Sequence, residues 1–208
     1  MRVLDFAIGL ATISRVNAAV RYKSANICET TAGVNSYSGY VDLDDHSHLF
    51  FWFFEARQSP ETAPITLWLN GGPGTDSLLG LFTGNVSSQS LSVAVSVPPG
   101  PVTAVDLGLT LAEVGPCTVN PDLTTSLDPF SWSEKSNLLS LSQPVGVGFS
   151  YGPNAAAIDT SELAAESAWL AVQAVISELP RMSPKIGSRD FNIWTERCIF
   201  TSEIIPGQ

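Results

Sequence analysis

The stretch APITLWLNGGPG, residues 63–74, joins an apolar segment to a glycine-rich turn. It carries the strongest signals for the fold and for a candidate site. Its ITLWLN part (65–70) predicts a short buried strand. Asn70-Gly71-Gly72-Pro73-Gly74 follows at once, and glycines after a strand let the backbone approach a ligand and point N–H groups at an oxyanion. A plain strand-ending turn explains the same glycines equally well. The lysine and the spacing of a phosphate-binding loop are missing, so the pattern does not predict nucleotide binding.

The segments around this stretch predict further strands. SYSGYVDL (36–43) and LFFWFFEA (49–56), separated by the polar cluster DDHSH, are typical of a β-hairpin. NLLSL (137–141) and DFNIWT (190–195) predict two more strands. Together with one helix, these strands indicate an α/β layer fold.

Residues 159–179 predict that helix. Asp159 and Glu162 resemble a capping box at its start, and Pro180 stands just past its end. Two stripes of apolar residues follow helical spacing. They are Leu163, Leu170 and Ala174 in one stripe and Trp169, Val172, Ile176 and Leu179 in the other.

Composition limits the possible partners of the chain. The 208 residues suffice for one domain with a sizeable core. The formal net charge of −10 argues against binding to nucleic acid or to an anionic membrane surface, since both need clustered Lys and Arg. Apart from the N-terminus, no stretch holds about 18 uninterrupted apolar residues, so no membrane span is expected.

The three cysteines, Cys28, Cys117 and Cys198, lie far apart and show no metal-ligand spacing. We therefore expect no metal site. In an oxidising compartment two of the three cysteines could form a disulfide, and the spacing does not indicate which two.

Residues 1–18 predict a secretory signal peptide. Arg2 supplies a positive start, an apolar run extends from Val3 to Ile13, and Val16-Asn17-Ala18 offers small residues for cleavage. An ordinary buried segment is the alternative, because Asp5 and Arg15 interrupt the apolar pattern.

GFSYG (148–152) fits the pattern G-x-S-x-G of a hydrolase nucleophile, but its surroundings do not. A helix should follow the serine, whereas Tyr151-Gly152-Pro153-Asn154 continues as a loop. The two histidines of the sequence, His46 and His48, lie more than 100 residues upstream in the predicted hairpin turn. A serine without a base is a weak nucleophile, so Ser150 is expected to have a structural role.

Several motifs in a fixed order make the sequence resemble the serine carboxypeptidases, and most of all the fungal secreted or vacuolar members. The motifs are CETTAGVNSYSGYVDL, FFWFFEAR, APITLWLNGGPG, LLGLF, GPC, FSW with SNLL, and QPVGVGFSYG, and they span residues 28–196 apart from 83–112. The resemblance implies the N-terminal part of an α/β-hydrolase fold, an incomplete mixed sheet flanked by helices. It also implies acid-favouring removal of C-terminal residues from peptides and proteins, without a cofactor, on the secretory route to the vacuole or the cell exterior.

The resemblance also assigns roles to particular residues. Asn70, Gly71 and Glu196 match residues that bind the terminal carboxylate of the substrate, and the backbone N–H of Gly72 matches half of the oxyanion hole. The family's nucleophilic serine corresponds to Arg197, and its Asp and His partners lie farther along than residue 208. No catalytic side chain is therefore expected in this chain, which we predict to be inactive.

Cys198, next to Arg197, is an alternative nucleophile, because a nearby cation lowers the pKa of a thiol. No histidine follows it to act as a base, so this alternative is disfavoured. The remaining alternative for the whole chain is a non-catalytic secreted protein that binds peptide C-termini. The sequence does not indicate the oligomeric state.

Two segments depart from the family within the expected domain, 19–208: an atypical insertion at 83–112 and a tail at 197–208. Removing 83–112 would join GLF to EVGPC, as in the family. We favour non-coding sequence read as protein over a genuine insertion in a truncated, decayed gene. A smaller departure is Thr75-Asp76-Ser77, which stands where many family members have a cysteine, so a disulfide from that position is absent.

Overall fold

A computed structural model describes most of the chain. The described residues are 18–71, 74–82, 95–97, 100–102, 114–153, 160–179 and 190–195. The predicted signal peptide up to residue 17, Gly72, residues 196–208 and most of the segment 83–112 lie outside them. Of that segment, the structure describes one short hairpin, β5 (Val95–Val97) with β6 (Gly100–Val102).

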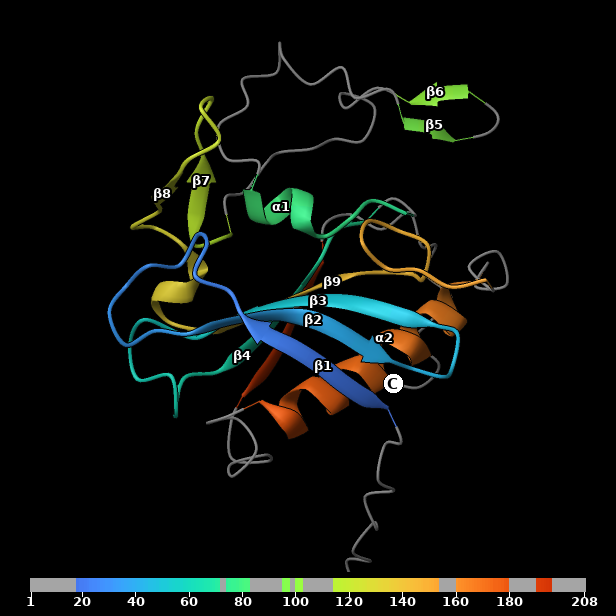
Figure 1. Cartoon of the computed structure of the whole chain (residues 1–208), viewed down its shortest axis with the longest axis horizontal. Helices are drawn as coiled ribbons and strands as arrows, with labels where there is room; N and C mark the ends of the chain where they lie inside the picture. Colours follow the sequence, from blue (N-terminus) through green and yellow to red (C-terminus); the bar gives the residue numbers. More distant parts are fainter. Residues whose placement is uncertain are drawn as a thin grey trace, which may run out of the picture.

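A six-stranded mixed sheet forms the centre of the molecule, in the order β1-β2-β3-β9-β4-β10 (Figure 1). Its first three strands, β1 (Ala19–Ser24), β2 (Ser36–Asp42) and β3 (His48–Phe54), are antiparallel neighbours. The next strand, β9 (Asn137–Ser142), is antiparallel to β3. It is also parallel to β4 (Ile65–Leu69), which pairs in parallel with β10 (Phe191–Thr195). The predicted hairpin and the three other predicted strands are thereby confirmed.

The two faces of the sheet are covered by different elements (Figure 1). One face carries the long helix α2 (Ser161–Glu178), and the opposite face carries the short helix α1 (Leu78–Phe82). On the α1 side there are also a small hairpin, β7 (Cys117–Val119) with β8 (Thr125–Leu127), and the 3-10 turn η1 (Trp132–Glu134). Helices on both sides of a mixed sheet confirm the predicted α/β-hydrolase class.

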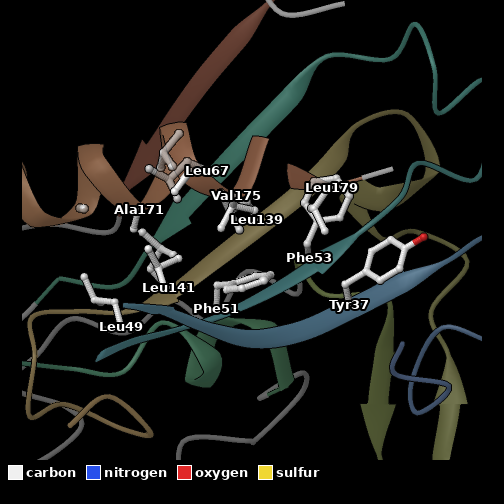
Figure 2. Close-up of a cluster of buried hydrophobic side chains, with 14 of the residues drawn as sticks. Tyr37, Leu49, Phe51, Phe53, Leu67, Leu139, Leu141, Ala171, Val175 and Leu179 are labelled. Carbon is white, nitrogen blue, oxygen red and sulfur yellow. The ribbon is translucent and has the colours of Figure 1, made fainter. Parts of the chain in front are cut away.

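Alternation along the strands divides the apolar side chains between two cores. Phe51 and Phe53 of β3 point to the α2 face, where they join Leu67, Leu139 and other buried residues (Figure 2). Phe54, Trp68 and Leu138, one position out of phase, lie in the α1 core. Successive side chains of a strand point to opposite faces, so the dense aromatic run of β3 supplies both cores at once.

The predicted helix is confirmed as α2, but its N-cap is a different residue and its buried face consists of small side chains. Thr160 is the N-cap, and its hydroxyl accepts a hydrogen bond from the N–H of Leu163, so the predicted Asp159–Glu162 capping box is wrong. Leu163, Trp169 and Leu170, large apolar residues of the two helical stripes, are 42%, 53% and 42% exposed. The sheet instead receives a stripe of small side chains with one leucine at its end: Ala168, Ala171, Val172, Ala174, Val175 and Leu179.

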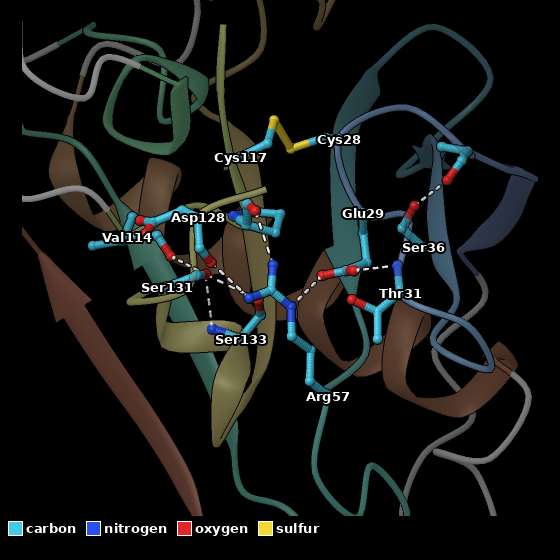
Figure 3. The surroundings of a disulfide bond; sticks show 12 residues. Cys28, Glu29, Thr31, Ser36, Arg57, Val114, Cys117, Asp128, Ser131 and Ser133 are labelled. Atoms are coloured by element: carbon cyan, nitrogen blue, oxygen red, sulfur yellow. Dashed lines mark hydrogen bonds and ion pairs between the residues drawn. A yellow bond between two sulfur atoms is a disulfide. The ribbon is translucent and has the colours of Figure 1, made fainter. Parts of the chain in front are cut away.

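A disulfide joins Cys28 to Cys117, so two of the three cysteines do pair (Figure 3). Cys28 lies in the segment between β1 and β2, and Cys117 begins β7. Both are almost completely buried in the α1 core. The bond fastens the N-terminal segment to the small β7–β8 hairpin across 89 residues of sequence.

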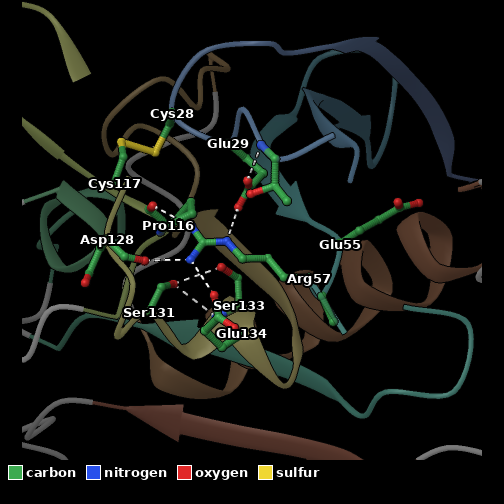
Figure 4. Close-up of polar contacts among 12 residues, drawn as sticks. Cys28, Glu29, Glu55, Arg57, Pro116, Cys117, Asp128, Ser131, Ser133 and Glu134 are labelled. Atoms are coloured by element: carbon green, nitrogen blue, oxygen red, sulfur yellow. Dashed lines mark hydrogen bonds and ion pairs between the residues drawn. A yellow bond between two sulfur atoms is a disulfide. The ribbon is translucent and has the colours of Figure 1, made fainter. Parts of the chain in front are cut away.

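Arg57, beyond the end of β3, is the centre of a network of hydrogen bonds and ion pairs near this disulfide (Figure 4). Its guanidinium donates to Glu29 Oε2 at 2.9 Å and to Glu134 Oε1 at 2.8 Å. It also donates to the backbone carbonyls of Asp128 and Pro116, at 2.6 and 2.9 Å. The side chain of Arg57 is only 8% exposed and that of Glu29 is fully buried. One planar group thus binds three parts of the chain that are distant from Arg57 in sequence, namely Glu29, Pro116 and the stretch from Asp128 to Glu134.

The Arg57 network predicts an acid-sensitive contribution to stability. Hydrogen bonding from Arg57 holds the pKa of Glu134 below its ordinary value of 4.5. A carboxyl whose pKa is lowered in the folded state stabilises that state above its ordinary pKa and loses the effect as the pH falls. Denaturant unfolding of the native chain and of Glu134→Gln should therefore differ above about pH 5 and converge as the pH falls through and below 4.5. A difference that stays constant across this range would contradict the prediction.

Candidate active site

The carboxyl ends of three parallel strands meet at one edge of the sheet and define the candidate site. In register, Thr195 of β10 pairs with Leu69 of β4, and Trp68 of β4 pairs with Ser140 of β9. The chain leaves β4 toward β9 on one side and returns through α2 to β10 on the other side. In open α/β sheets, ligands bind outside the carboxyl ends at such a reversal of strand order. Asn70 follows β4 at this edge.

The side chain of Asn70 is 3% exposed, and the residues around it determine its orientation. Its Oδ1 accepts a hydrogen bond from Trp68 Nε1 at 2.8 Å and a longer one from the N–H of Gly80 at 3.3 Å. A Cβ on Gly80 would lie 2.5 Å from Trp68 Nε1 and 2.6 Å from Asn70 Oδ1, so only glycine fits there. The amide oxygen of Asn70 is therefore held by two hydrogen bonds inside the protein.

Both ends of the glycine loop (residues 71–75) are tied to their surroundings. The backbone N–H of Asn70 donates to Ser77 Oγ at 3.1 Å, and the N–H of Thr75 donates to the carbonyl of Gly71 at 3.3 Å. Gly74 has φ of +90°, a conformation that favours glycine. These contacts give a compact turn after β4, as an oxyanion or carboxylate loop requires, although a plain turn could be built in the same way.

Ser150 lies close to this edge, but its hydroxyl is occupied by the backbone. The residue is 4% exposed, and its Oγ accepts from the N–H of Phe50 at 2.7 Å and donates to the carbonyl of Ser142. The chain from Tyr151 to Pro153 continues without a helix. Ser150 thus joins its loop to β3 and β9, which agrees with the structural role expected from the sequence.

An Asp–His pair lies near this loop, and sequence analysis did not anticipate it. His48 Nδ1 lies 2.6 Å from Asp42 Oδ1, and the ring of His48 contacts that of Tyr151 in a tilted arrangement, with centroids 4.5 Å apart. The guanidinium of Arg21 binds both oxygens of Asp42 at 2.7 Å, and its hydrogen bond is the main reason that the pKa of Asp42 is lowered. Since the hydroxyl of Ser150 is already bonded to two backbone groups, the pair has no serine to activate there. Its contacts join β1, β2 and β3.

The structure places only some of the residues that the sequence selected. Asn70 and Gly71 follow β4 at the carboxyl edge of the sheet, whereas Gly72, Glu196, Arg197 and Cys198 fall outside the described residues. Asp76, Ser77 and Ser142 contribute to the site but were not selected as site residues. For Asp76 and Ser77 the signal was present in TDS, directly after the glycines, but polar residues after a turn are too common to single out.

Neither a metal centre nor a membrane helix emerges from the described ranges. Within them, no three His, Cys, Asp or Glu side chains come together in a way that could hold a metal ion. The helices described there also include none with the length and apolar character needed to cross a membrane.

The mixed sheet, the α2 crossover and the site at the carboxyl ends of β4 and β10 define an α/β-hydrolase class of protein. The family model described as serine carboxypeptidase matches residues 27–89 and 100–197. The chain therefore belongs to the serine carboxypeptidase family. The match includes parts of the predicted insertion 83–112 and omits only residues 90–99 between its two halves.

Similar proteins are fungal carboxypeptidases. Carboxypeptidase S1 of Penicillium janthinellum is 39% identical over 175 residues, which cover 84% of this chain and 33% of that protein. Carboxypeptidase Y homolog A of Trichophyton equinum is 34% identical over 181 residues, 84% of this chain and 27% of the relative. The chain thus spans a third or less of these relatives.

A solved structure shows the same fold. It is that of Kex1(delta)p, a prohormone-processing carboxypeptidase from Saccharomyces cerevisiae. The TM-score is 0.50 at 22% identity, over 77% of this chain and 30% of that chain.

Proposed function

We propose that this chain is part of a serine-type peptidase that removes C-terminal residues from peptides and proteins. In this proposal, the chain contributes the residues that bind the terminal carboxylate of the substrate. The observation that supports it best is the locked amide of Asn70 at the carboxyl end of β4. Asn70 Oδ1 is bonded to Trp68 and Gly80, so the amide is held in one orientation. An amide oriented in this way can donate an N–H to an anion.

Glu196 is the second proposed carboxylate-binding residue. In sequence it follows Thr195, the last residue of β10, which pairs in register with Leu69 of β4. A carboxylic acid that stays protonated can donate a hydrogen bond to a substrate carboxylate. This chemistry accounts for a preference for acid pH. The N–H of Gly72 is the proposed oxyanion-hole donor.

We further propose that the 208-residue chain binds peptide C-termini without hydrolysing them. Arg197 follows Glu196 at the position of the family's nucleophile, and a guanidinium, which stays protonated, is not a nucleophile. Without a nucleophile, only the weak effects of binding and of the oxyanion hole remain. This observation favours the second candidate function, a non-catalytic binding protein.

The test compares two peptides that differ only at the C-terminus. A short peptide with a free carboxylate should bind at least about tenfold more tightly than its C-terminal amide, because the amide loses a charge-assisted hydrogen bond. Asn70→Ala should abolish this preference, whereas Asn120→Ala, a matched change on the remote β7–β8 hairpin, should preserve it. Isothermal titration calorimetry at pH 4.5 and pH 7 provides the measurement, with circular dichroism to verify folding.

Two results would contradict this proposal in different ways. Equal affinity for the free carboxylate and the amide would exclude a carboxylate site. Release of C-terminal amino acids by the purified chain would show that Arg197 does not prevent catalysis, and the non-catalytic function would be wrong.

The proposed location is the secretory route, to the vacuole or the cell exterior. The buried Cys28–Cys117 disulfide supports it, since such bonds persist in oxidising compartments. We also propose that 83–112 and 197–208 are read-through of non-coding sequence. The spliced transcript across codons 80–115 and 190–208 tests this, because a transcript that encodes both segments would establish them as part of the protein.

A further inference from the structure

We propose that Asp76 is a positioning residue that fastens the glycine loop (residues 71–75) to the carboxyl end of β9. The consequence for ligand binding rests on the proposed carboxylate function of Asn70 and Gly71. The attachment itself does not depend on that function and can be tested separately.

The carboxylate of Asp76 links two elements through one oxygen. Its Oδ1 accepts a hydrogen bond from Ser142 Oγ, at the end of β9, at 2.8 Å. The same oxygen accepts from the N–H of Leu78, the first residue of α1, at 3.1 Å. The backbone carbonyl of Asp76 accepts a further bond from the N–H of Leu79 at 3.0 Å. Asp76 therefore holds the start of α1 and the end of β9 together.

The other oxygen of Asp76 faces the loop that follows β9. A Cβ on Gly148 would overlap Asp76 Oδ2, and Gly148 has φ of +54°, a conformation that side chains seldom adopt. Gly148 therefore leaves the space that the carboxylate occupies. Two residues farther along, Ser150 fastens the same loop to Phe50 and Ser142. The loop after β9 and the loop after β4 thus pack together at the carboxylate of Asp76.

Ser77, the next residue, holds the opposite end of the glycine loop. Its Oγ accepts from the N–H of Asn70, while Asp76 binds Ser142, so adjacent side chains attach the loop to β4 and to β9. Polar contacts of two adjacent side chains therefore make the attachment. A binding loop held in its active conformation loses less entropy when a ligand binds.

Hydrogen exchange of the loop amides tests the attachment directly. In Asp76→Ala, exchange in residues 70–78 should be about tenfold faster, because both acceptor contacts of Oδ1 are lost. Asp76→Asn keeps an acceptor at this position and should stay within about twofold of the native rate. Thr66→Val removes a buried hydrogen bond to Ser136 at the far end of β4 and serves as the control for lowered stability. It should leave exchange in 70–78 unchanged.

Peptide binding tests the consequence. Asp76→Ala should weaken binding of the free-carboxylate peptide about tenfold, with Asp76→Asn restoring it and Thr66→Val having no effect. Unchanged exchange in Asp76→Ala, or an equal acceleration in Asp76→Asn, would overturn the role of Asp76. If the native chain does not prefer the carboxylate but Asp76→Ala still exchanges faster, the proposed function fails and the positioning role stands.

Discussion

Replacing Arg57 with alanine is expected to lower the free energy of unfolding by about 3–5 kcal/mol. The arginine is 8% exposed and is bonded to the fully buried carboxylate of Glu29 and to two backbone carbonyls. Its loss would leave Glu29 buried without its cation, and removing one partner of a buried ion pair costs much more than the pair itself contributes. Urea unfolding at pH 7 measures the change.

A matched control is available in an exposed ion pair. Arg21 forms a two-pronged ion pair with Asp42, but its side chain is 54% exposed. Arg21→Ala should therefore have a much smaller effect than Arg57→Ala, because solvent screens an exposed pair. If the two substitutions had equal effects, burial would not be the reason for the importance of Arg57. Glu29→Gln combined with Arg57→Ala should recover part of the loss, since the stranded charge is then gone.

Opening the Cys28–Cys117 disulfide is the second change with a large expected effect. The bond closes a loop between residues 89 apart, and the chain-entropy estimate for a loop of this length is about 4.6 kcal/mol. Cys28→Ser should lower the free energy of unfolding by about this amount, and reduction with dithiothreitol should do the same to the native chain. Both cysteines are buried in the α1 core, so their separation also disturbs packing there.

The double and single variants separate the loop effect from the effect of each serine. Cys28→Ser with Cys117→Ser should be no more than about 1 kcal/mol less stable than Cys28→Ser alone, because the cross-link can be lost only once. Cys198→Ser should leave the effect of dithiothreitol unchanged. A reduced native chain that unfolds at the same urea concentration as the oxidised chain would contradict the prediction.

The strands were predictable because their signals are local. The apolar ITLWLN run became β4, and the aromatic run at 49–56 became the second strand of the predicted hairpin. For the same reason β1 was missed, since AVRYKS has a weak apolar pattern and is largely exposed. Its pairing with β2 is a property of the sheet edge, where a strand needs only one neighbour.

The buried face of α2 could not be predicted from helical spacing alone. Leucine and tryptophan are strong hydrophobic signals, yet Leu163, Trp169 and Leu170 are exposed. The helix instead presents Ala168 and Ala171 to the sheet, because small side chains let the backbone of a helix come close to crowded aromatic strands. Which stripe fits depends on the side chains opposite, and the helix sequence does not contain that information.

For the candidate site, the sequence alone determined the residue types and their order: a strand, an asparagine, glycines, and a glutamate after another strand. Only the tertiary structure decided that β4 and β10 are adjacent and in register, which brings Asn70 and the chain leading to Glu196 to one edge. The tertiary structure also chose Cys28 and Cys117 among three cysteines and committed Asn70 Oδ1 to Trp68 and Gly80. Local patterns follow from backbone geometry and apolar spacing, whereas pairings across many residues depend on how the whole sheet packs.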